Sequence, residues 1–321
     1  MALTDQSVAQ RTGWRPSYGD QIFWGITLLI ALGVIGLMLW MCYEMWQQSS
    51  LSREAFGWSF FWTTTWDPVA QQFGALPYIF GTVVSSLVAL VLAGPIGIGI
   101  AIFLVELAPD QIRNPIGFLV EMLASIPSVV YGLWGLFVMV PWIGSMLGPA
   151  LSRSLGFLPL FKGPSFGVSM LAASLILTVM VIPTVAAVAR DVLQAVPNHQ
   201  REAMLAMGAT KWEMVWYAVL PYGRAGMIGG IMLGLGRAFG ETMAVTMVIG
   251  NQPIIHASLL QPGHTMAAVI ANEFTEATYN LYLHALIEIG LVLFLVSFVL
   301  NLLARLLVWQ VSRGPAGAIR A

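Results

Sequence analysis

An arginine and a glutamate stand four residues apart in an otherwise apolar, glycine-rich stretch of the sequence. Arg237 and Glu241 lie between Ala225 and Gly250, and on a continuous helix residues at this spacing share one face. A guanidinium can bind an oxyanion through two parallel hydrogen bonds, which a lysine ammonium cannot do. Counted from Pro221, Arg237 lies about 24 Å along a helix, near the middle of a bilayer. We therefore expect Arg237 and Glu241 to line a pathway for an anion.

Other interpretations of the intramembrane charges remain open. Arg237 and Glu241 could instead neutralise each other and hold helices together, because an ionisable residue at membrane depth costs about 2.5–3.5 kcal/mol. In a pathway, Glu241 would either accept a hydrogen bond from a P–OH group or hold Arg237 in place. Glu121 is a weaker candidate for the same pathway. For Glu121, and for Glu288 with His284 one turn earlier, structural pairing is the favoured interpretation.

A charged connection at residues 190–221 carries a second motif. Pro197 and Asn198 predict the start of a helix that continues to Ala206 and is interrupted by Gly208. Thr210 followed three residues later by Glu213 is a capping-box pattern, which predicts a second helix ending at Leu220. The connection is thus expected to form two short helices that meet at a glycine elbow. An amphipathic hairpin in the lipid headgroups would satisfy the same pattern.

The elements that position these residues are predicted to be membrane helices. Hydrophobic residues make up 58% of the 321 residues and charged residues 9%, against about 25% charged residues in soluble domains. About 20 mostly apolar residues span a bilayer, and six stretches meet this test. They are about Ile22–Tyr43, Leu76–Val105, Pro115–Val140, Ser165–Ala189, Ala225–Gly250 and Leu281–Trp309. The predicted class is an all-α, polytopic membrane protein with a cytoplasmic segment at 1–21 and one membrane domain at 22–321.

The distribution of basic residues predicts the orientation of these spans. With the N-terminus inside, ten basic residues lie on the cytoplasmic side and three on the opposite side, as retention of positive charge predicts. The cytoplasmic set is Arg11, Arg15, Arg113, Arg190, Arg201, Lys211, Arg224, Arg305, Arg313 and Arg320, and the outer set is Arg53, Arg153 and Lys162. Both termini are therefore expected in the cytoplasm.

Several classes of function find no support in the sequence. The net charge of −1 gives no electrostatic footprint for nucleic acid. The single cysteine, Cys42, permits no internal disulfide, and no histidine pattern typical of a metal site is present. No phosphate-binding loop of the type G-x-x-x-x-G-K-[ST] occurs, so the chain is not expected to hydrolyse ATP or to be an enzyme. No bound cofactor or metal is expected.

Residues in the elbow resemble the EAA motif of ABC importer permeases. The matching residues are Glu202, Ala203, Gly208 and the pair Leu220-Pro221, whereas Met204 departs from the pattern. The resemblance implies that the elbow is a coupling helix that docks on a cytoplasmic ATPase. Arg201 and Glu202 would then offer charged contacts, Ala203 would permit close approach, and Gly208 would form the corner.

Most of the chain, from about Phe61 onward, resembles the PstC-type permeases of bacterial high-affinity phosphate importers. The stretches that carry this resemblance are residues 106–109 (ELAP), 124–135 (ASIPSVVYGLWG), 182–191, 229–245 (GGIMLGLGRAFGETMAV) and 271–274 (ANEF). The resemblance implies a six-helix, MetI-like type I permease in the bacterial inner membrane that imports phosphate by alternating access. It also implies that Arg237 and Glu241 form a charged pair in the translocation pathway.

The same resemblance implies the partners. A PstA-like second permease would complete the pathway, a PstB-like ATPase dimer would bind ATP and magnesium, and a PstS-like periplasmic protein would deliver phosphate. From the residues alone, an ion-coupled anion carrier or channel without an ATPase remains an alternative. In that case the elbow would be a lipid-binding hairpin and Glu241 a proton relay.

Overall fold

The computed structural model describes residues 18–312, and the regular structure of this part is helical apart from one isolated bridge between Asp67 and Gln72. Six helices are long and apolar enough to cross a membrane. They cover Tyr18–Gln48, Leu76–Leu107, Ser128–Leu155, Met170–Gln194, Lys211–Phe239 and Asn280–Gln310. The all-α class and the six spans expected from hydropathy are therefore confirmed, although the third and fifth spans are displaced from their predicted ranges by more than ten residues at each end.

Internal contacts divide the chain into residues 1–47 and residues 48–321. The described part of the first unit lies within the helix α1 (Tyr18–Gln48), along which no residue is buried. The predicted first span lies within this helix. Residues 1–17, which make up most of the expected cytoplasmic segment, lie outside the described residues, as do Arg313 and Arg320.

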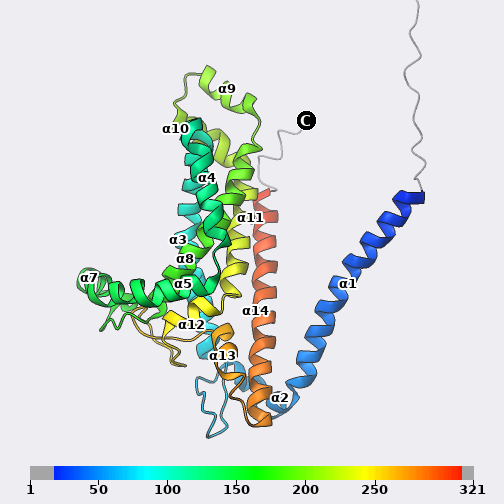
Figure 1. Ribbon diagram of the computed structural model, residues 1–321, viewed down its shortest axis with the longest axis vertical. Coiled ribbons are helices and arrows are strands. Elements are labelled where there is room, and N and C mark those ends of the chain that lie inside the picture. Colours follow the sequence, from blue (N-terminus) through cyan, green and yellow to red (C-terminus); the bar gives the residue numbers. More distant parts are fainter. Residues whose placement is uncertain (1–17, 313–321) are drawn as a thin grey trace, which may run out of the picture. The chain divides into compact units, whose positions relative to one another are not determined.

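The second unit is a helical bundle (Figure 1), in which short π and 3-10 turns extend or join several helices. Its α-helices are α2 (Ser50–Phe56), α3 (Leu76–Ile102), α4 (Asp110–Ser125), α5 (Ser128–Trp134), α6 (Val140–Trp142), α7 (Gly148–Leu155), α8 (Met170–Gln194), α9 (Asn198–Ala206), α10 (Lys211–Met214), α11 (Leu220–Phe239), α12 (Met243–Ile249), α13 (Met266–Glu273) and α14 (Asn280–Ser312). The π turns are Phe103–Leu107, Gly135–Met139, Ile143–Leu147 and Val215–Val219, and the 3-10 turns are Gly57–Phe61 and Pro159–Phe161.

The predicted third span, Pro115–Val140, is wrong because the chain breaks in its middle. Ile126 has extended backbone angles, as expected for a residue before a proline, and Pro127 has no N–H with which to continue the ladder. The helix α4 therefore ends at Ser125. A new membrane-length helix begins at Ser128 and runs through α5, α6 and α7 to Leu155. Figure 1 shows α4 running along the bundle and the α5–α7 helix running across it.

The predicted fifth span, Ala225–Gly250, is displaced in a similar way. Its helix begins earlier, at Lys211, because a π turn at Val215–Val219 allows α10 to continue into α11 just ahead of Pro221. A π turn shifts the backbone hydrogen bonds by one residue. This turn lies just before Pro221, which has no N–H to donate to the helix. The helix ends earlier than predicted, at Phe239, and α12 begins at Met243.

The centre of the bundle is α8, which packs against α3 and α11. Val185 of α8 is fully buried. A Cβ atom on Gly97 of α3 would lie 2.9 Å from the Cβ and Cγ1 atoms of Val185, and one on Gly234 of α11 would lie 3.1 Å from its Cγ2 atom. Small residues permit such close approach between membrane helices. The two glycines therefore set the distances from α3 and α11 to α8.

A compact aromatic cluster holds the loop before α3 against α13 and α14. The indole Nε1–H of Trp66 donates a hydrogen bond to Glu273 at 2.8 Å, and the hydroxyl of Tyr282 donates to the same carboxylate oxygen at 2.6 Å. The Trp66 ring packs edge-on against Phe73 and Tyr78. One carboxylate thus joins a loop to two helices that lie about 200 residues later in the chain.

Candidate functional site

Arg237 lies in the last turn of α11, where α4 and α8 also meet. Its Nη1 atom donates to the Thr184 hydroxyl of α8 at 3.3 Å, and its Nη2 atom donates to the Ala124 carbonyl at 3.4 Å. Ala124 belongs to the last turn of α4, where a helix presents carbonyl groups without intrahelical partners and a negative dipole end. The break at Pro127 therefore creates the acceptor that orients Arg237.

The expectation that Arg237 and Glu241 share one helix face as a pair is wrong. The helix α11 ends at Phe239 with Gly240 as its cap, so Glu241 lies outside it. The Glu241 carboxylate accepts a hydrogen bond from the backbone N–H of Ala244 at 3.2 Å, in the first turn of α12. Among the described residues, no ion pair within 4 Å links the two. Self-neutralisation does not explain these charges.

The guanidinium of Arg237 keeps donors available for a ligand. It has five N–H donors, whereas the two hydrogen bonds it makes are long compared with the usual 2.7–3.2 Å. Arg237 is half-buried, and no ion pair involving it occurs among residues 18–312. A half-buried, uncompensated arginine at a junction of three helices is an arrangement that can bind an oxyanion.

Among the described residues, neither Glu121 nor Glu288 forms an ion pair with Arg237. Glu121 of α4 forms an ion pair with Arg190 of α8 at 2.6 Å, so the favoured structural pairing is found, and the partner belongs to the same chain. Glu288 of α14 is buried, and its Oε2 atom, like Nδ1 of His284, has no hydrogen-bond partner. No group of three or more potential metal ligands occurs in the part of the chain that the structure describes.

The elbow forms as the capping signals predict, up to its last residues. The helix α9 spans Asn198–Ala206, and Gly208 has φ +87°, a left-handed conformation that favours glycine. Both halves of the capping box are present, since Thr210 accepts from the Glu213 N–H and the Glu213 carboxylate accepts from the Thr210 N–H. The second helix does not end at Leu220, however, because it continues through α10 into α11.

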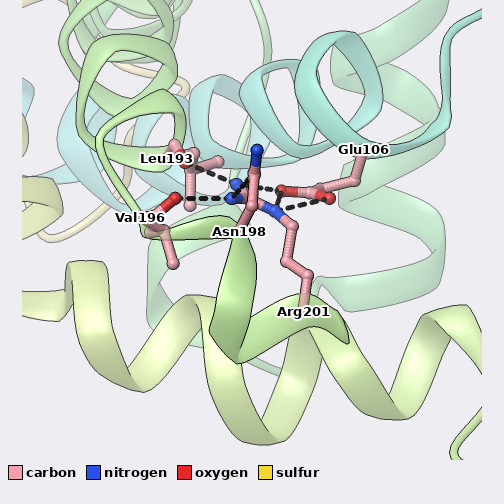
Figure 2. A network of polar contacts seen from close by, with 5 residues as sticks. All are labelled: Glu106, Leu193, Val196, Asn198 and Arg201. Atoms are coloured by element: carbon pink, nitrogen blue, oxygen red, sulfur yellow. Dashed lines mark hydrogen bonds and ion pairs between the residues drawn. The ribbon is translucent and has the colours of Figure 1, made fainter. Parts of the chain in front are cut away.

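Arg201 does not offer its charge to the surface as expected. Figure 2 shows its guanidinium pointing inward, toward Glu106 and the end of α8. It forms an ion pair with Glu106 at 2.8 Å and also donates to the carbonyls of Leu193 and Val196 and to the side chain of Asn198. The side chains of Arg201 and Glu106 are only 15% and 6% exposed. Arg201 therefore fixes α9 to the bundle.

The other predicted coupling residues remain accessible. Glu202, Ala203 and Gly208 are exposed. The exposed rings of Trp212 and Trp216, further along the elbow, stack with their centroids 5.6 Å apart. The elbow thus combines the exposed carboxylate of Glu202, small residues and an aromatic surface.

Sequence reasoning assigned no role to Glu106, Thr184 or Asn198. The sequence could have indicated a structural role for Glu106, because this acid directly follows an apolar run of membrane length and lies three residues before Pro109. Thr184 follows Pro183 inside an apolar span, but threonine is too common in such helices to indicate a contact with arginine. The position of Asn198 at the start of a helix indicated only a helix boundary.

The chain matches the family model described as "Binding-protein-dependent transport system inner membrane component" over residues 93–313. It is 49% identical over 261 residues to the "Phosphate transport system permease protein PstC" of Xylella fastidiosa strain 9a5c, covering 80% of each chain. The proteins of the same name from Mesorhizobium japonicum and Haemophilus influenzae are 43% and 44% identical, with coverage of at least 91% of each chain.

Solved structures share the fold at low sequence identity. A chain of a bacterial ABC transporter involved in the import of the acidic polysaccharide alginate aligns with a TM-score of 0.57 and 14% identity, over 91% of this chain and all of that one. A chain of the inward-facing MetNI methionine ABC transporter aligns with a TM-score of 0.54 and 17% identity, over 74% of this chain and 95% of that one. The family model and the relatives named above show that the chain belongs to the family of inner-membrane components of binding-protein-dependent transport systems and, within it, to the PstC permeases.

Proposed function

We propose that this chain is the permease subunit of an ATP-driven importer that moves inorganic phosphate across the bacterial inner membrane. The family, the six membrane-length helices and the relatives named as phosphate transport permeases support this function. The single observation that carries the choice of an anion is the half-buried guanidinium of Arg237, which no carboxylate within ion-pair distance neutralises among the described residues.

In this proposal, Arg237 forms a weak, transient phosphate site. Thr184 and the Ala124 carbonyl aim the guanidinium through two long hydrogen bonds, so a passing anion can recruit the remaining donors. A low affinity suits transport, since the ligand must also leave. Glu241 lies near the beginning of α12 and is engaged with the Ala244 N–H, which leaves its second oxygen to accept a hydrogen bond from a P–OH group.

The energy for transport comes from other subunits. The exposed face of α9, with Glu202 and Ala203, docks on a PstB-like ATPase dimer that binds ATP and magnesium, and Gly208 forms the corner of the elbow. A PstA-like permease completes the pathway, and a PstS-like protein delivers phosphate from outside. Closure of the ATPase dimer draws the two elbows together and opens the pathway outward, and hydrolysis resets it. Both chain termini lie in the cytoplasm in this arrangement.

The test is phosphate uptake by the complete complex in proteoliposomes containing ATP. Arg237→Ala should abolish uptake while the subunits still assemble, because the helix end that carries it is formed by backbone and apolar contacts. Arg224→Ala, on the same helix but outside the proposed site, is the matched control and should retain uptake. Normal uptake by Arg237→Ala would overturn the proposed site. Uptake driven by a proton gradient without any ATPase would support the ion-coupled alternative instead.

A further inference from the structure

The helix α9 is held to the bundle mainly by polar contacts. None of its residues is buried, and Met204 is its one apolar side chain that packs, partly buried, against the hydrophobic core of the described residues, so apolar packing fixes it weakly. Its N-terminal link to α8 is the short segment Ala195–Pro197, and its C-terminal link is the glycine elbow at Gly208. A helix that must transmit movement needs a stiffer connection than two backbone links. The Arg201 network in Figure 2 supplies such a connection.

The geometry of this network joins three helices. The Nε and Nη2 atoms of Arg201 donate to Glu106 Oε1 at 3.1 and 2.8 Å, and Glu106 belongs to the π turn that ends α3. Nη2 also donates to the Leu193 carbonyl at 2.8 Å, and Nη1 donates to the Val196 carbonyl at 2.5 Å. The Leu193 carbonyl lies in the last turn of α8, where the helix dipole favours a cation, and Val196 belongs to the short link that follows α8.

Burial makes this network stiff. Exposed ion pairs are screened by solvent and contribute little, but here the two side chains are 15% and 6% exposed. The planar guanidinium also restricts the relative orientation of its acceptors, which a single ammonium would not do. The ends of α3 and α8 and the first turns of α9 are therefore held as one body. A displacement of α9 should therefore displace the ends of α3 and α8 as well.

The same body extends to the candidate anion site. The helix α8 continues without interruption from Leu193 back to Thr184, nine residues or about 14 Å along its axis. Thr184 orients the guanidinium of Arg237. A displacement of α9 can thus reach Arg237 through a single rigid helix.

We infer that Arg201 and Glu106 form a clasp that transmits movement of α9 to α3 and α8, so that both are positioning residues for coupled transport. This inference rests on the proposed function, in which α9 docks on an ATPase. The clasp differs from the docking surface itself, because Arg201 faces the bundle and leaves Glu202 exposed.

The first test measures the rigidity of the clasp without reference to transport. Spin labels are placed on the exposed positions Leu107→Cys, in the π turn that ends α3, and His199→Cys, in α9, in a Cys42→Ser background of the full complex, and their separation is measured by continuous-wave electron paramagnetic resonance. A narrow distribution is expected in the parent protein and a broad one in Glu106→Gln. Asp110→Asn, which removes an exposed ion pair with Arg113, is the control and should leave the distribution narrow. A narrow distribution in Glu106→Gln would overturn the clasp.

The second test measures coupling in proteoliposomes. Glu106→Gln should lower the phosphate transported per ATP hydrolysed by about tenfold, while the complex assembles and retains ATPase activity. Glu106→Asp keeps the charge on a shorter side chain and should restore part of the phosphate transported per ATP hydrolysed. If Glu106→Gln fails to assemble, Glu106→Asp takes its place in this test. An unchanged ratio in a variant with a broadened distribution would reject the transmission role. A parent complex that transports no phosphate would refute the proposed function, and the label separation would still test the clasp.

Discussion

The contact of Val185 with Gly97 and Gly234 predicts an unusual pattern of stabilities. Substituting Gly97 with alanine places a Cβ atom 2.9 Å from two carbons of Val185 and 3.2 Å from the backbone nitrogen of Ala186. Ordinary van der Waals contacts between such atoms measure about 3.5–4.0 Å, so α3 and α8 must separate by about 0.5–1 Å. Because α8 is also in close contact with α11 through Gly234, it cannot simply move away.

The expected magnitude follows from two opposing effects. Overpacking of a well-packed site costs about 1–3 kcal/mol, whereas replacement of glycine by alanine inside a helix gains about 0.5–1 kcal/mol. Gly99 is the matched control, since it lies two residues away on the same helix, is exposed, and would have nothing within 4 Å of an added Cβ. Gly99→Ala should be neutral or stabilising. Gly97→Ala should be less stable than this control by about 1–3 kcal/mol.

A double mutant identifies the cause. Val185→Ala alone leaves a cavity and is destabilising, but it removes the atoms that the new Cβ would contact. The Gly97→Ala, Val185→Ala protein should therefore be more stable than the sum of the two single effects predicts. Unfolding of the purified protein in detergent, followed by tryptophan fluorescence, measures these differences. Equal stabilities of Gly97→Ala and Gly99→Ala, or strict additivity in the double mutant, would show that this contact does not limit helix packing.

Two further predictions concern the elbow and a buried histidine. Thr210→Ala removes the helix cap that accepts a hydrogen bond from the Glu213 N–H, which should cost about 1 kcal/mol of helix stability. Hydrogen exchange of the backbone amides at Lys211–Met214 should therefore be faster in Thr210→Ala than in the parent, whereas Thr210→Ser should exchange like the parent. Equal exchange rates in all three proteins would contradict the cap. Burial lowers the pKa of His264 to about 4, below the unfolded value of about 6.5. As the pH falls, the unfolded state therefore binds a proton at His264 before the folded state does. The folded state keeps its full stability above pH 6.5 and loses stability as the pH falls from 6.5 toward 4. The loss should reach about 3 kcal/mol. In thermal melts between pH 7.5 and 4.5, His264→Gln should depend less on pH than the parent, and parallel curves would exclude this assignment.

The sequence alone was sufficient for the parts of the structure that depend on local patterns. Apolar stretches of membrane length predicted six spans, because bilayer thickness fixes the number of residues a helix needs. The capping box at Thr210 and the glycine at position 208 predicted the corner of the elbow, because both act within a few residues of backbone. The class of the protein followed from these features together with the segment around Arg237.

Only the tertiary structure decided where helices break and which charges meet. Pro95 and Pro183 lie inside continuous helices, whereas Pro127 separates two helices, and the outcome depends on whether surrounding groups satisfy the freed backbone atoms. Arg237 contacts Ala124 and Thr184 rather than Glu241, since α11 ends before Glu241. Likewise, Arg201 meets Glu106 across 95 residues of sequence. Contacts over such separations arise from the packing of whole helices, which no local spacing encodes.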